Sequence, residues 1–450
     1  MMEYFWPIVM CLGLVFGVFS GYPVAFILAG VGTLTAIAAD VPMLFLSTGV
    51  SRIFSGILSN WLLIAVPLFV FMGLMLEKSG IAQRLLRSLA GILGHLPGGY
   101  AFAVTIIGIV MAASTGIIGA SVVLMGVMAL PVMLKSRYDP RLATAVIAAT
   151  GTLGILIPPS IMLVILGDTM RLSVGDLFAG ALFPGLLLGG LYILLLILIA
   201  IFRPQWMPAL EATEKVGWLR ALGRLSADIL APLLLILAVL GSIVAGIATP
   251  TEAAALGAMG AFLLAVFSGN LCFRQFLEVS RETVKTSAMI MFVMIGATVF
   301  SVIFRKLGGD VMIADMLGVS ESGGHPNPYW VLFLIMAFVF VLGMFLDWVE
   351  ITFIVIPIVT PIIMGLDFGL PPDQTLLWFA ILFAVNLQTS FLTPPFGYAL
   401  FYIKGIAPPE VTTRMIYLGI IPFVAIQLLG LILTIVFPEL VLWLPQKILN

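Results

Sequence analysis

Apolar runs of membrane-spanning length recur along almost the whole chain, and the segment 178–202 contains no charged residue. A transmembrane helix needs about 20 consecutive apolar residues, whereas a strand of a membrane barrel has about ten residues of alternating character. Apolar residues make up 62% of the 450 residues and charged residues 9%, against roughly 45–50% and about 25% in soluble domains. The pattern predicts an all-α polytopic membrane protein and excludes a soluble globular one.

The same landmarks occur twice in the same order, which indicates an internal repeat. Pro23 and Gly30 in the first half match Pro250 and Gly257 in the second half, with the same spacing within each pair. The further matches, in rising order along both halves, are Gly80 with Gly308, Pro131 with Pro361, Pro158-Pro159 with Pro394-Pro395, and Pro184 with Pro422.

These matches divide the chain into repeats at 1–203 and 226–440, joined by a polar connector at 204–225. We expect each repeat to contain two long spans, an amphipathic stretch, a span, a broken hairpin, a broken span and a final span. In the first repeat these segments fall at 4–20, 22–40, 43–60, 62–78, 100–134, 142–167 and 178–202.

The hairpins are predicted from polar or small residues in the middle of an apolar run. Ser114-Thr115-Gly116 interrupts the first hairpin, and the residues from Leu346 to Glu350 interrupt the second, at 328–366. The halves on either side of a break are too short to cross a bilayer, which takes about 20 residues. Each hairpin is therefore expected to turn back within the membrane and return to the side from which it entered.

Basic residues indicate the orientation, because Lys and Arg concentrate in cytoplasmic loops. Lys135, Arg137 and Arg141 follow the first hairpin, whereas the segment after the second contains two acids and no base. The two hairpins should therefore enter from opposite sides, which makes the repeat inverted and places the amino terminus outside. Arg305 and Lys306 fall on the side that the rule disfavours.

Two broken spans, Ala148 to Ser160 and Val385 to Gly397, each contain a pair of prolines. Non-helical backbone within a bilayer is tolerated only where it is buried or lines a cavity. A proline leaves the carbonyl four residues before it without a hydrogen-bond donor in the helix. Such carbonyl oxygens, together with the side-chain oxygens of Ser, Thr, Asn and Gln, are good ligands for Na+. The positive end of each half-helix favours an anion. The alternative is that the prolines only kink helices for packing, but breaks at matched positions favour binding sites.

Asp347 and Glu350 are acids within an apolar run, where such residues are costly and usually functional. We expect each carboxylate to have one of three roles: it binds a cation, it carries a proton, or it lies in the water-filled opening of the hairpin. Glu252, three residues after Thr249, is instead expected to cap the start of a helix.

Charge and histidine content exclude other functions. The 20 Lys+Arg and 21 Asp+Glu give a net charge of -1 without a long basic run, so no nucleic-acid partner is expected. His95 and His325 lie in Gly- and Pro-rich loops, so neither catalysis nor a cofactor other than Na+ is expected. A channel would need a continuous polar lining, whereas matched helix breaks favour alternating access.

The most specific segments of the chain are PLFVFMGLMLEKSGIAQRLL, MAASTGIIGASVV, ATGTLGILIPPS, IATPTEAAALGA and NLQTSFLTPPFGYALFYIKG. With them, nearly the whole chain resembles the large membrane subunit (DctM-type) of tripartite ATP-independent periplasmic, or TRAP, transporters. The resemblance implies a Na+-driven importer of an organic acid in a bacterial or archaeal inner membrane. It also implies two partners, a small four-helix membrane subunit and a periplasmic substrate-binding protein.

The resemblance further implies a fixed scaffold and a transport domain that moves like an elevator. Scaffold helices and arms fall at 1–60 and 226–287, and transport elements at 61–203 and 288–440, with a C-terminal tail at 441–450. A stand-alone Na+/divalent-anion symporter of related architecture is the alternative, and it would not require a binding protein.

Three groups of site residues follow from the resemblance. The first sodium site falls on Ser114, Thr115, Gly116, Thr150, Gly151, Thr152 and Gly154. The second sodium site falls on Gly343, Asp347, Asn386, Gln388, Thr389 and Ser390. The substrate carboxylate is expected near Pro158, Pro159, Thr393 and Pro394.

The second hairpin tip departs from many family members, which carry Glu-Pro where this chain has Asp347-Trp348. The departure resembles the branch associated with 2-oxo acids, mannitol or chloroaromatic compounds. A C4-dicarboxylate, a 2-oxo acid, a sugar acid and an aromatic acid therefore all stay open as substrates.

Overall fold

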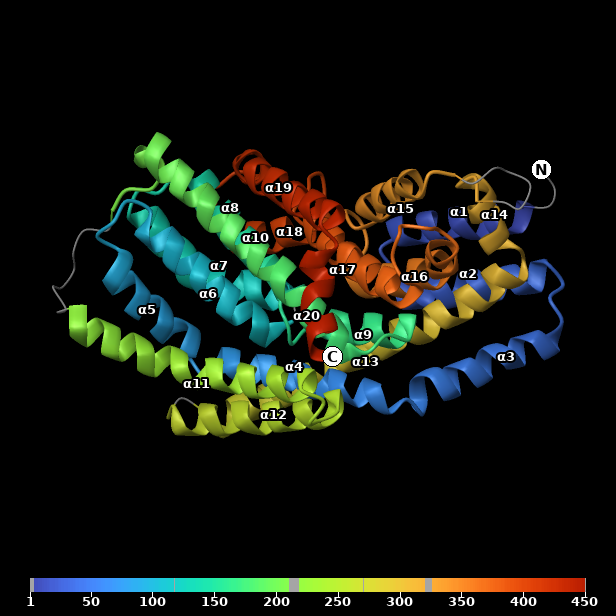
Figure 1. The fold of residues 1–450 in the computed structure, drawn as a ribbon, viewed down its shortest axis with the longest axis horizontal. Coiled ribbons are helices and arrows are strands. Elements are labelled where there is room, and N and C mark those ends of the chain that lie inside the picture. The colour runs from blue at the N-terminus through green and yellow to red at the C-terminus, as the bar shows by residue number, and fades with distance from the viewer. Residues whose placement is uncertain (1–3, 117, 210–217, 270, 320–325, 450) are drawn as a thin grey trace.

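The computed structural model describes residues 4–116, 118–209, 218–269, 271–319 and 326–449, and no strand occurs in these ranges. Helices α1 to α10 form the first half of the chain and α11 to α20 the second half (Figure 1). His325 and most of the polar part of the connector lie outside the described residues. The all-helical prediction is confirmed.

The described residues of the first repeat form ten α-helices and short turns of other helical types. The α-helices are α1 (Phe5–Phe19), α2 (Val24–Ala38), α3 (Met43–Ile53), α4 (Ala65–Lys78), α5 (Ile81–Leu93), α6 (Gly99–Thr115), α7 (Ile118–Lys135), α8 (Pro140–Thr152), α9 (Ile161–Met170) and α10 (Val174–Phe202). A π-helix at Phe54–Leu58 and 3-10 turns at Trp61–Ile64, Leu153–Ile155 and Pro204–Trp206 complete this half.

The second half repeats this order. Its helices are α11 (Trp218–Val244), α12 (Pro250–Phe267), α13 (Phe273–Lys306), α14 (Gly309–Met316), α15 (Pro328–Leu342), α16 (Trp348–Met364), α17 (Pro372–Ser390), α18 (Tyr398–Ile406), α19 (Thr413–Val436) and α20 (Glu439–Leu449). Helix α13 corresponds to α3 and α4 together, and α20 has no counterpart in the described part of the first repeat. The two hairpins are α6–α7 and α15–α16, and the two broken spans are α8–α9 and α17–α18.

The two repeats pack on each other reciprocally. Helix α2 packs on α13 and α12 on α4, while α7 packs on α18 and α16 on α9. In the same way α8 packs on α19 and α17 on α10. Such exchanged contacts arise when two copies of one unit are related by a two-fold axis, so they agree with an inverted repeat.

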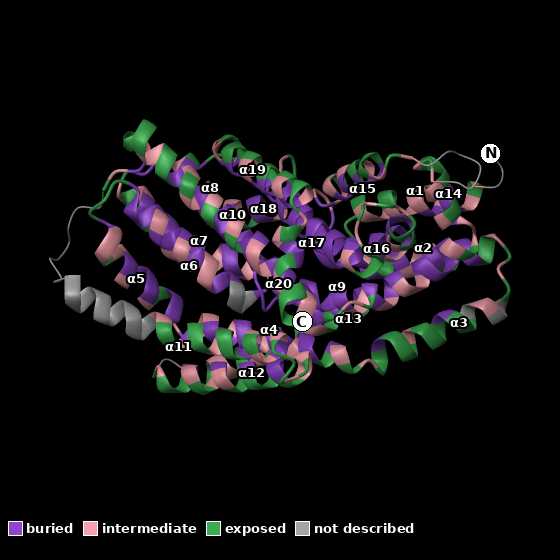
Figure 2. Ribbon diagram, viewed as in Figure 1, coloured by how far each residue is buried: buried purple, intermediate pink, exposed green. Residues whose placement is uncertain are grey.

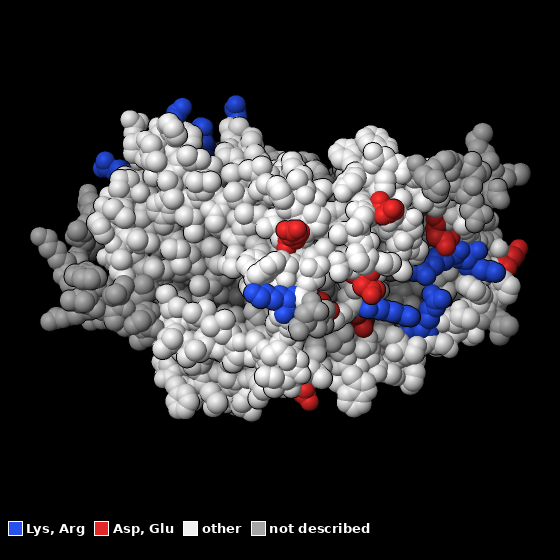
Figure 3. Space-filling view, in the orientation of Figure 1, with Lys and Arg blue, Asp and Glu red and all other residues white. Residues whose placement is uncertain are grey.

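Within the described residues, six helices are long and apolar enough to cross a membrane. They are Trp61–Lys78, Ile118–Lys135, Val174–Phe202, Pro250–Phe267, Phe273–Lys306 and Thr413–Val436. The face in Figure 3 is largely uncharged, with Lys, Arg, Asp and Glu confined to a few clusters. Buried residues concentrate in the central helices, and α17 is buried from Thr375 to Ser390 (Figure 2). A membrane protein with this distribution exposes apolar side chains to lipid and keeps its polar groups inside.

Several segments differ from the sequence-based prediction. Helix α5 occupies a region for which we predicted no helix, because its apolar residues at Ile81, Leu85 and Leu89 form one buried face. Helix α11 begins at Trp218, inside the predicted connector. The predicted tail at 441–450 lies mostly within α20.

The two amphipathic stretches also differ. In the first repeat the helix stops at Asn60, whose side chain accepts a hydrogen bond of 3.0 Å from the backbone N–H of Leu62. In the second repeat α13 continues without a break for 34 residues. The predicted cap of α12 is confirmed, since the backbone N–H of Thr249 donates to the carboxylate of Glu252 at 2.8 Å.

Candidate functional site

The tip of the first hairpin contacts the break of the first broken span. Gly116 ends α6 with a φ of +59°, a conformation that glycine adopts without strain. A Cβ at this position would lie 3.3 Å from Cδ1 of Ile161, which is the first residue of α9. The glycine therefore allows the hairpin tip to lie directly against the start of the second half-helix (α6 and α9 in Figure 1).

The remaining residues of the first predicted sodium site lie together at the end of α8. Thr150, Gly151, Thr152 and Gly154 are all buried, and both α6 and α7 pack on this segment. The hydroxyl of Thr150 donates to Val146 O at 2.7 Å, which leaves its lone pairs available. The side chains of the other two predicted residues, Ser114 and Thr115, lie outside the described part of the structure.

The second hairpin contacts the second broken span at the end of its first half-helix. A Cβ on Gly343 would collide with the hydroxyl of Ser390, the last residue of α17. The side-chain amide of Asn386 donates to Met336 O at 2.8 Å and so joins α17 to α15. Because Asn386 and Ser390 are four residues apart, both lie on the face of α17 that is turned to the hairpin.

Asp347 and Glu350 form a reciprocal cap at the start of α16. Asp347 Oδ1 accepts from the backbone N–H of Trp348 at 2.8 Å, and Glu350 Oε2 accepts from the backbone N–H of Asp347 at 3.0 Å. The break spans 343–347, so the part of the predicted break after Asp347 belongs to the helix instead. Both carboxylates are half-buried, and a carboxylate beside the positive helix end can bind a cation while its charge is stabilised.

Thr389 of the second predicted set lies three residues after Asn386 and so beside it on α17, and its hydroxyl donates to Val385 O at 2.9 Å. The side chain of Gln388 reaches the opposite side, where its Nε2 lies 3.5 Å from the hydroxyl of Tyr192 on α10. The structure thus brings Gly343, Asn386 and Ser390 together and separates Gln388 from them.

The predicted substrate residues differ in exposure between the two breaks. Pro158 and Pro159 are buried, whereas Thr393 and Pro394 are half-buried and Pro395 is exposed. The peptide bonds within both proline pairs are cis. Beyond the second break, the ring of Phe396 lies 5.1 Å from the ring of Phe345 at the second hairpin tip.

Sequence reasoning missed two polar residues of this region, Tyr192 and Gln427. Both are 0% exposed, and Gln427 Nε2 donates to the Tyr192 hydroxyl. Each lies within a long apolar span, and an isolated polar residue in such a span was the signal that could have identified it. In the described residues, His, Cys, Asp and Glu form no cluster of three or more suited to a metal ion.

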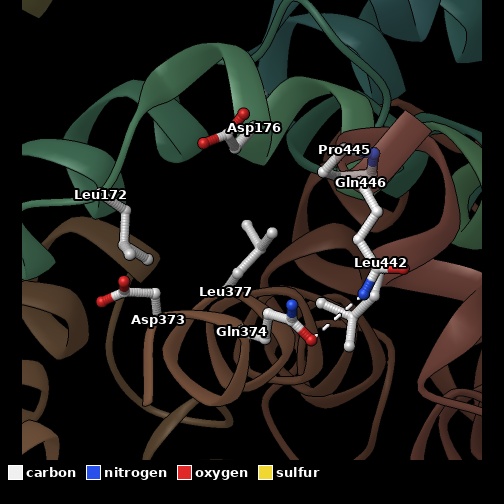
Figure 4. A pocket seen from close by; sticks show the side chains of 8 residues that line it. All are labelled: Leu172, Asp176, Asp373, Gln374, Leu377, Leu442, Pro445 and Gln446. Carbon is white, nitrogen blue, oxygen red and sulfur yellow. Dashed lines mark hydrogen bonds between the residues drawn. The ribbon is translucent and has the colours of Figure 1, made fainter. Parts of the chain in front are cut away.

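A small pocket of about 110 Å³ lies elsewhere, between the start of α10, the start of α17 and α20 (Figure 4). Asp176 and Asp373 line it, and the amides of Gln374 and Gln446 are joined across it at 3.1 Å. It contains none of the predicted site residues. The candidate site is therefore the meeting point of hairpin tips and helix breaks, and not this pocket.

Comparisons with known proteins agree with this architecture. Residues 9–440 match the family described as the tripartite ATP-independent periplasmic transporter, DctM component. The C4-dicarboxylate TRAP transporter large permease protein DctM of Pseudomonas aeruginosa is 32% identical over 391 residues, covering 86% of this chain and 87% of that protein. The sialic acid TRAP transporter large permease protein SiaM of Vibrio cholerae is 29% identical over 98% of this chain and 99% of that protein.

Two further comparisons extend the range of relatives. The 2,3-diketo-L-gulonate TRAP transporter large permease protein YiaN of Escherichia coli is 26% identical over 86% of this chain and 87% of that protein. The crystal structure of the Alcanivorax borkumensis YdaH transporter has a TM-score of 0.56 at 16% identity, covering 90% of this chain and 91% of that one. This last similarity concerns the fold alone.

Proposed function

Because the chain belongs to the DctM family of tripartite ATP-independent periplasmic transporters, we propose that it imports an organic acid across the inner membrane with Na+ as the coupling ion. The resemblance predicted from the sequence is confirmed, and the relatives are named as permease subunits of transporters and not as enzymes. The chain is a multi-pass membrane protein. We further propose that its amino terminus faces the periplasm.

The observation that supports Na+ coupling is the contact of each hairpin tip with a helix break. Gly116 lies against Ile161 in one repeat, and Gly343 lies against Ser390 in the other. Thr150 packs against Gly108 of the first hairpin and Asn386 bonds Met336 O of the second, so each broken span turns buried oxygen-bearing side chains toward its hairpin. We propose that these oxygens replace the hydration shell of Na+ with hard ligands. Two such contacts favour two Na+ sites, with Asp347 contributing a carboxylate to the second.

The substrate proposal rests on what the relatives share. They are named for C4-dicarboxylates, sialic acid and 2,3-diketo-L-gulonate, all of which carry a carboxylate. The half-helices that begin after Ser160 and Gly397 turn their positive ends toward the two breaks, which favours a carboxylate without a buried base. We therefore place the substrate carboxylate between the breaks, near Pro158, Thr393 and Pro394.

We also propose that transport follows an elevator mechanism. The hairpins and broken spans form the moving part, and α1, α2, α11 and α12 form the scaffold. Helix α3 and the first half of α13 are long elements that connect the two parts (Figure 1). Two Na+ moving with a monoanion supply about 5 kcal/mol, at about 1.4 kcal/mol per tenfold gradient and about 2.3 kcal/mol per charge at 100 mV.

Two partners belong to the proposal, a small membrane subunit and a periplasmic binding protein. The alignment with the isethionate TRAP transporter permease protein DctMQ of Oleidesulfovibrio alaskensis covers 95% of this chain but 65% of that protein. That relative therefore contains sequence outside the region that aligns with this chain. The remaining alternative is a stand-alone Na+/anion symporter.

The test is uptake of labelled organic acids into liposomes that contain the chain and a candidate small membrane subunit. Uptake should require both a periplasmic binding protein and an inward Na+ gradient. Na+-driven uptake without the binding protein would support the stand-alone symporter instead. Uptake driven equally by K+ would contradict Na+ coupling.

A further inference from the structure

The turn that begins at Asn60 lies between a helix of the proposed moving part and a helix of the proposed scaffold. The 3-10 turn Trp61–Ile64, which follows Asn60, packs on both α9 and α12. Helix α9 packs in turn on α16 of the second hairpin, whereas α12 packs on α11. In Figure 1 these segments meet near the centre, where α9 lies beside the start of α4. The turn therefore touches both parts of the molecule.

The amide of Asn60 bonds both to its own turn and to α9. Its Oδ1 accepts from the backbone N–H of Leu62 at 3.0 Å, and its Nδ2 donates to Gly56 O at 3.2 Å. The same Nδ2 also donates to Oδ1 of Asp168, near the end of α9. Asn60 and Asp168 are both half-buried, and a hydrogen bond to a carboxylate is about twice as strong as one between neutral groups.

The next residue along the chain is bonded to the scaffold instead. The hydroxyl of Thr251, in the first turn of α12, donates to Trp61 O at 3.2 Å. Two consecutive residues, Asn60 and Trp61, are thus tied to α9 and to α12 respectively. Because a hydrogen bond is lost beyond about 3.5 Å between its heavy atoms, a movement of α9 past α12 by more than that cannot keep both bonds. The bond from Asn60 to Asp168 is the one that joins the turn to the moving part.

The second repeat has no equivalent of Asn60. Gly80 corresponds to Gly308, and the residue 20 positions before each of them is Asn60 in the first repeat and Ala288 in the second. Helix α13 runs through this position without a break. An alanine side chain has no polar group, so it can form none of the bonds that Asn60 forms.

The second repeat also replaces the acceptor of this bond. Pro159 corresponds to Pro395, and the residue nine positions after each of them is Asp168 in the first repeat and Lys404 in the second. The ammonium of Lys404 donates to Val411 O at 2.8 Å, within the segment that follows its own helix. The bond between the turn and the broken span is therefore possible in the first repeat only.

A contact that only one of two inverted repeats can form distinguishes the two end states of a transporter. If the repeats were identical, each such contact would have a counterpart in the opposite state and would favour neither state. Resting on the elevator mechanism of the proposed function, we propose that Asn60 and Asp168 are positioning residues that form a latch. The latch holds the moving part in the position seen here, and its release is a step of each transport cycle.

The test measures the position of the moving part directly in the purified full chain. Spin labels are attached to cysteines that replace Val127 on α7 and Leu256 on α12, which are 60% and 65% exposed, in a chain whose Cys11 and Cys272 are replaced by serine. Electron paramagnetic resonance then gives the distribution of distances between the hairpin and the scaffold. The ratio of the second distance population to the first reports the equilibrium between the end states.

Two single variants remove the latch from opposite sides. Asp168→Ala deletes the acceptor and leaves the local bonds of Asn60 in place. Asn60→Asp deletes the donor and keeps the acceptor for the N–H of Leu62. We expect each variant to raise the population ratio by about tenfold or more, as for the loss of a hydrogen bond to a charged group. If one variant does not fold, as judged by gel filtration, the other carries the test.

A double variant and a matched control separate the latch from a general loss of packing. Asn60→Asp combined with Asp168→Asn exchanges donor and acceptor, so it should reverse most of the shift caused by Asn60→Asp. Thr169, the next residue of α9, is half-buried and donates to Ile165 O of its own helix at 2.8 Å. The population ratio of Thr169→Val should therefore equal that of the unmodified chain.

Several outcomes would overturn the latch. They are an unchanged ratio in both single variants, an equal shift in Thr169→Val, and a shift that the double variant does not reverse at all. Failure of the proposed function has a different signature, because the elevator mechanism requires two positions of the moving part. One identical distance in every variant, with Na+ or K+ as the only cation, would contradict that mechanism and the latch with it.

Discussion

The guanidinium of Arg305 on α13 donates a hydrogen bond of 2.9 Å to the carbonyl oxygen of Pro357 on α16. Pro361 lies four residues further along α16 and has no N–H, so it leaves this carbonyl without a helical partner. The ammonium of Lys306 lies 5.0 Å from the centre of the Phe45 ring. Both cations thus have partners within the protein, which would offset the cost of lying on the side that the predicted orientation disfavours.

We expect Arg305→Met to lower the free energy of unfolding by about 1–3 kcal/mol, because it leaves a half-buried carbonyl without a donor. The loss should shrink in a Pro361→Ala background, where the new N–H of residue 361 bonds Pro357 O within the helix. Thermal unfolding in detergent of the two single variants and the double variant measures this difference. Equal losses of stability in both backgrounds would show that the guanidinium stabilises the protein through a different contact.

Asp347→Ala should abolish Na+-dependent uptake without preventing membrane insertion. Because Asp347 also caps α16, this variant should in addition lose about 1 kcal/mol of stability. Asp347→Asn keeps an acceptor for the cap and removes the charge, so it should retain stability and still lose Na+-driven uptake. Uptake is measured at limiting and saturating Na+, and normal uptake by Asp347→Asn would remove the carboxylate from the second Na+ site.

Gly116→Ala should destabilise the protein by roughly 1–2 kcal/mol, because its φ of +59° is unfavourable for a residue with a Cβ. Gly190→Ala is the control, since Gly190 lies within α10 and a Cβ there would meet nothing within 4 Å. Alanine at 190 should stabilise the helix by about 0.5–1 kcal/mol. Shifts of opposite sign in Tm are the expected outcome, and a stabilising Gly116→Ala would contradict the described hairpin tip.

Asn60 provides the fourth prediction, because its Nδ2 donates to Asp168 Oδ1 at the end of α9 while its Oδ1 accepts from Leu62. Asn60→Asp keeps the acceptor but replaces the donor with a second carboxylate. We expect a loss of about 1.5–3 kcal/mol, the usual contribution of a hydrogen bond to a charged group. Combining it with Asp168→Asn restores one donor and one acceptor, so the double variant should regain much of the loss in Tm.

The sequence predicted the hairpins and broken spans because prolines, glycines and polar residues interrupt apolar runs at matched positions. It did not predict α5, whose charged face lowers its hydropathy although its other face is buried. It also grouped Gln388 with Asn386 and Ser390, although residues two apart on a helix point in different directions. That residue's actual partner, Tyr192, depends on how α10 packs on α17, and a single sequence does not contain that information.

The difference between the two connecting elements has a mechanical consequence. Helix α13 is an unbroken rod of 34 residues, about 51 Å long at 1.5 Å per residue, and it transmits a displacement along its whole length. Its counterpart is jointed, because α3 passes through a π-helix and a 3-10 turn before α4 begins. In the proposed elevator movement, we therefore expect bending in the first repeat to be concentrated between residues 54 and 64, while α13 in the second repeat stays straight.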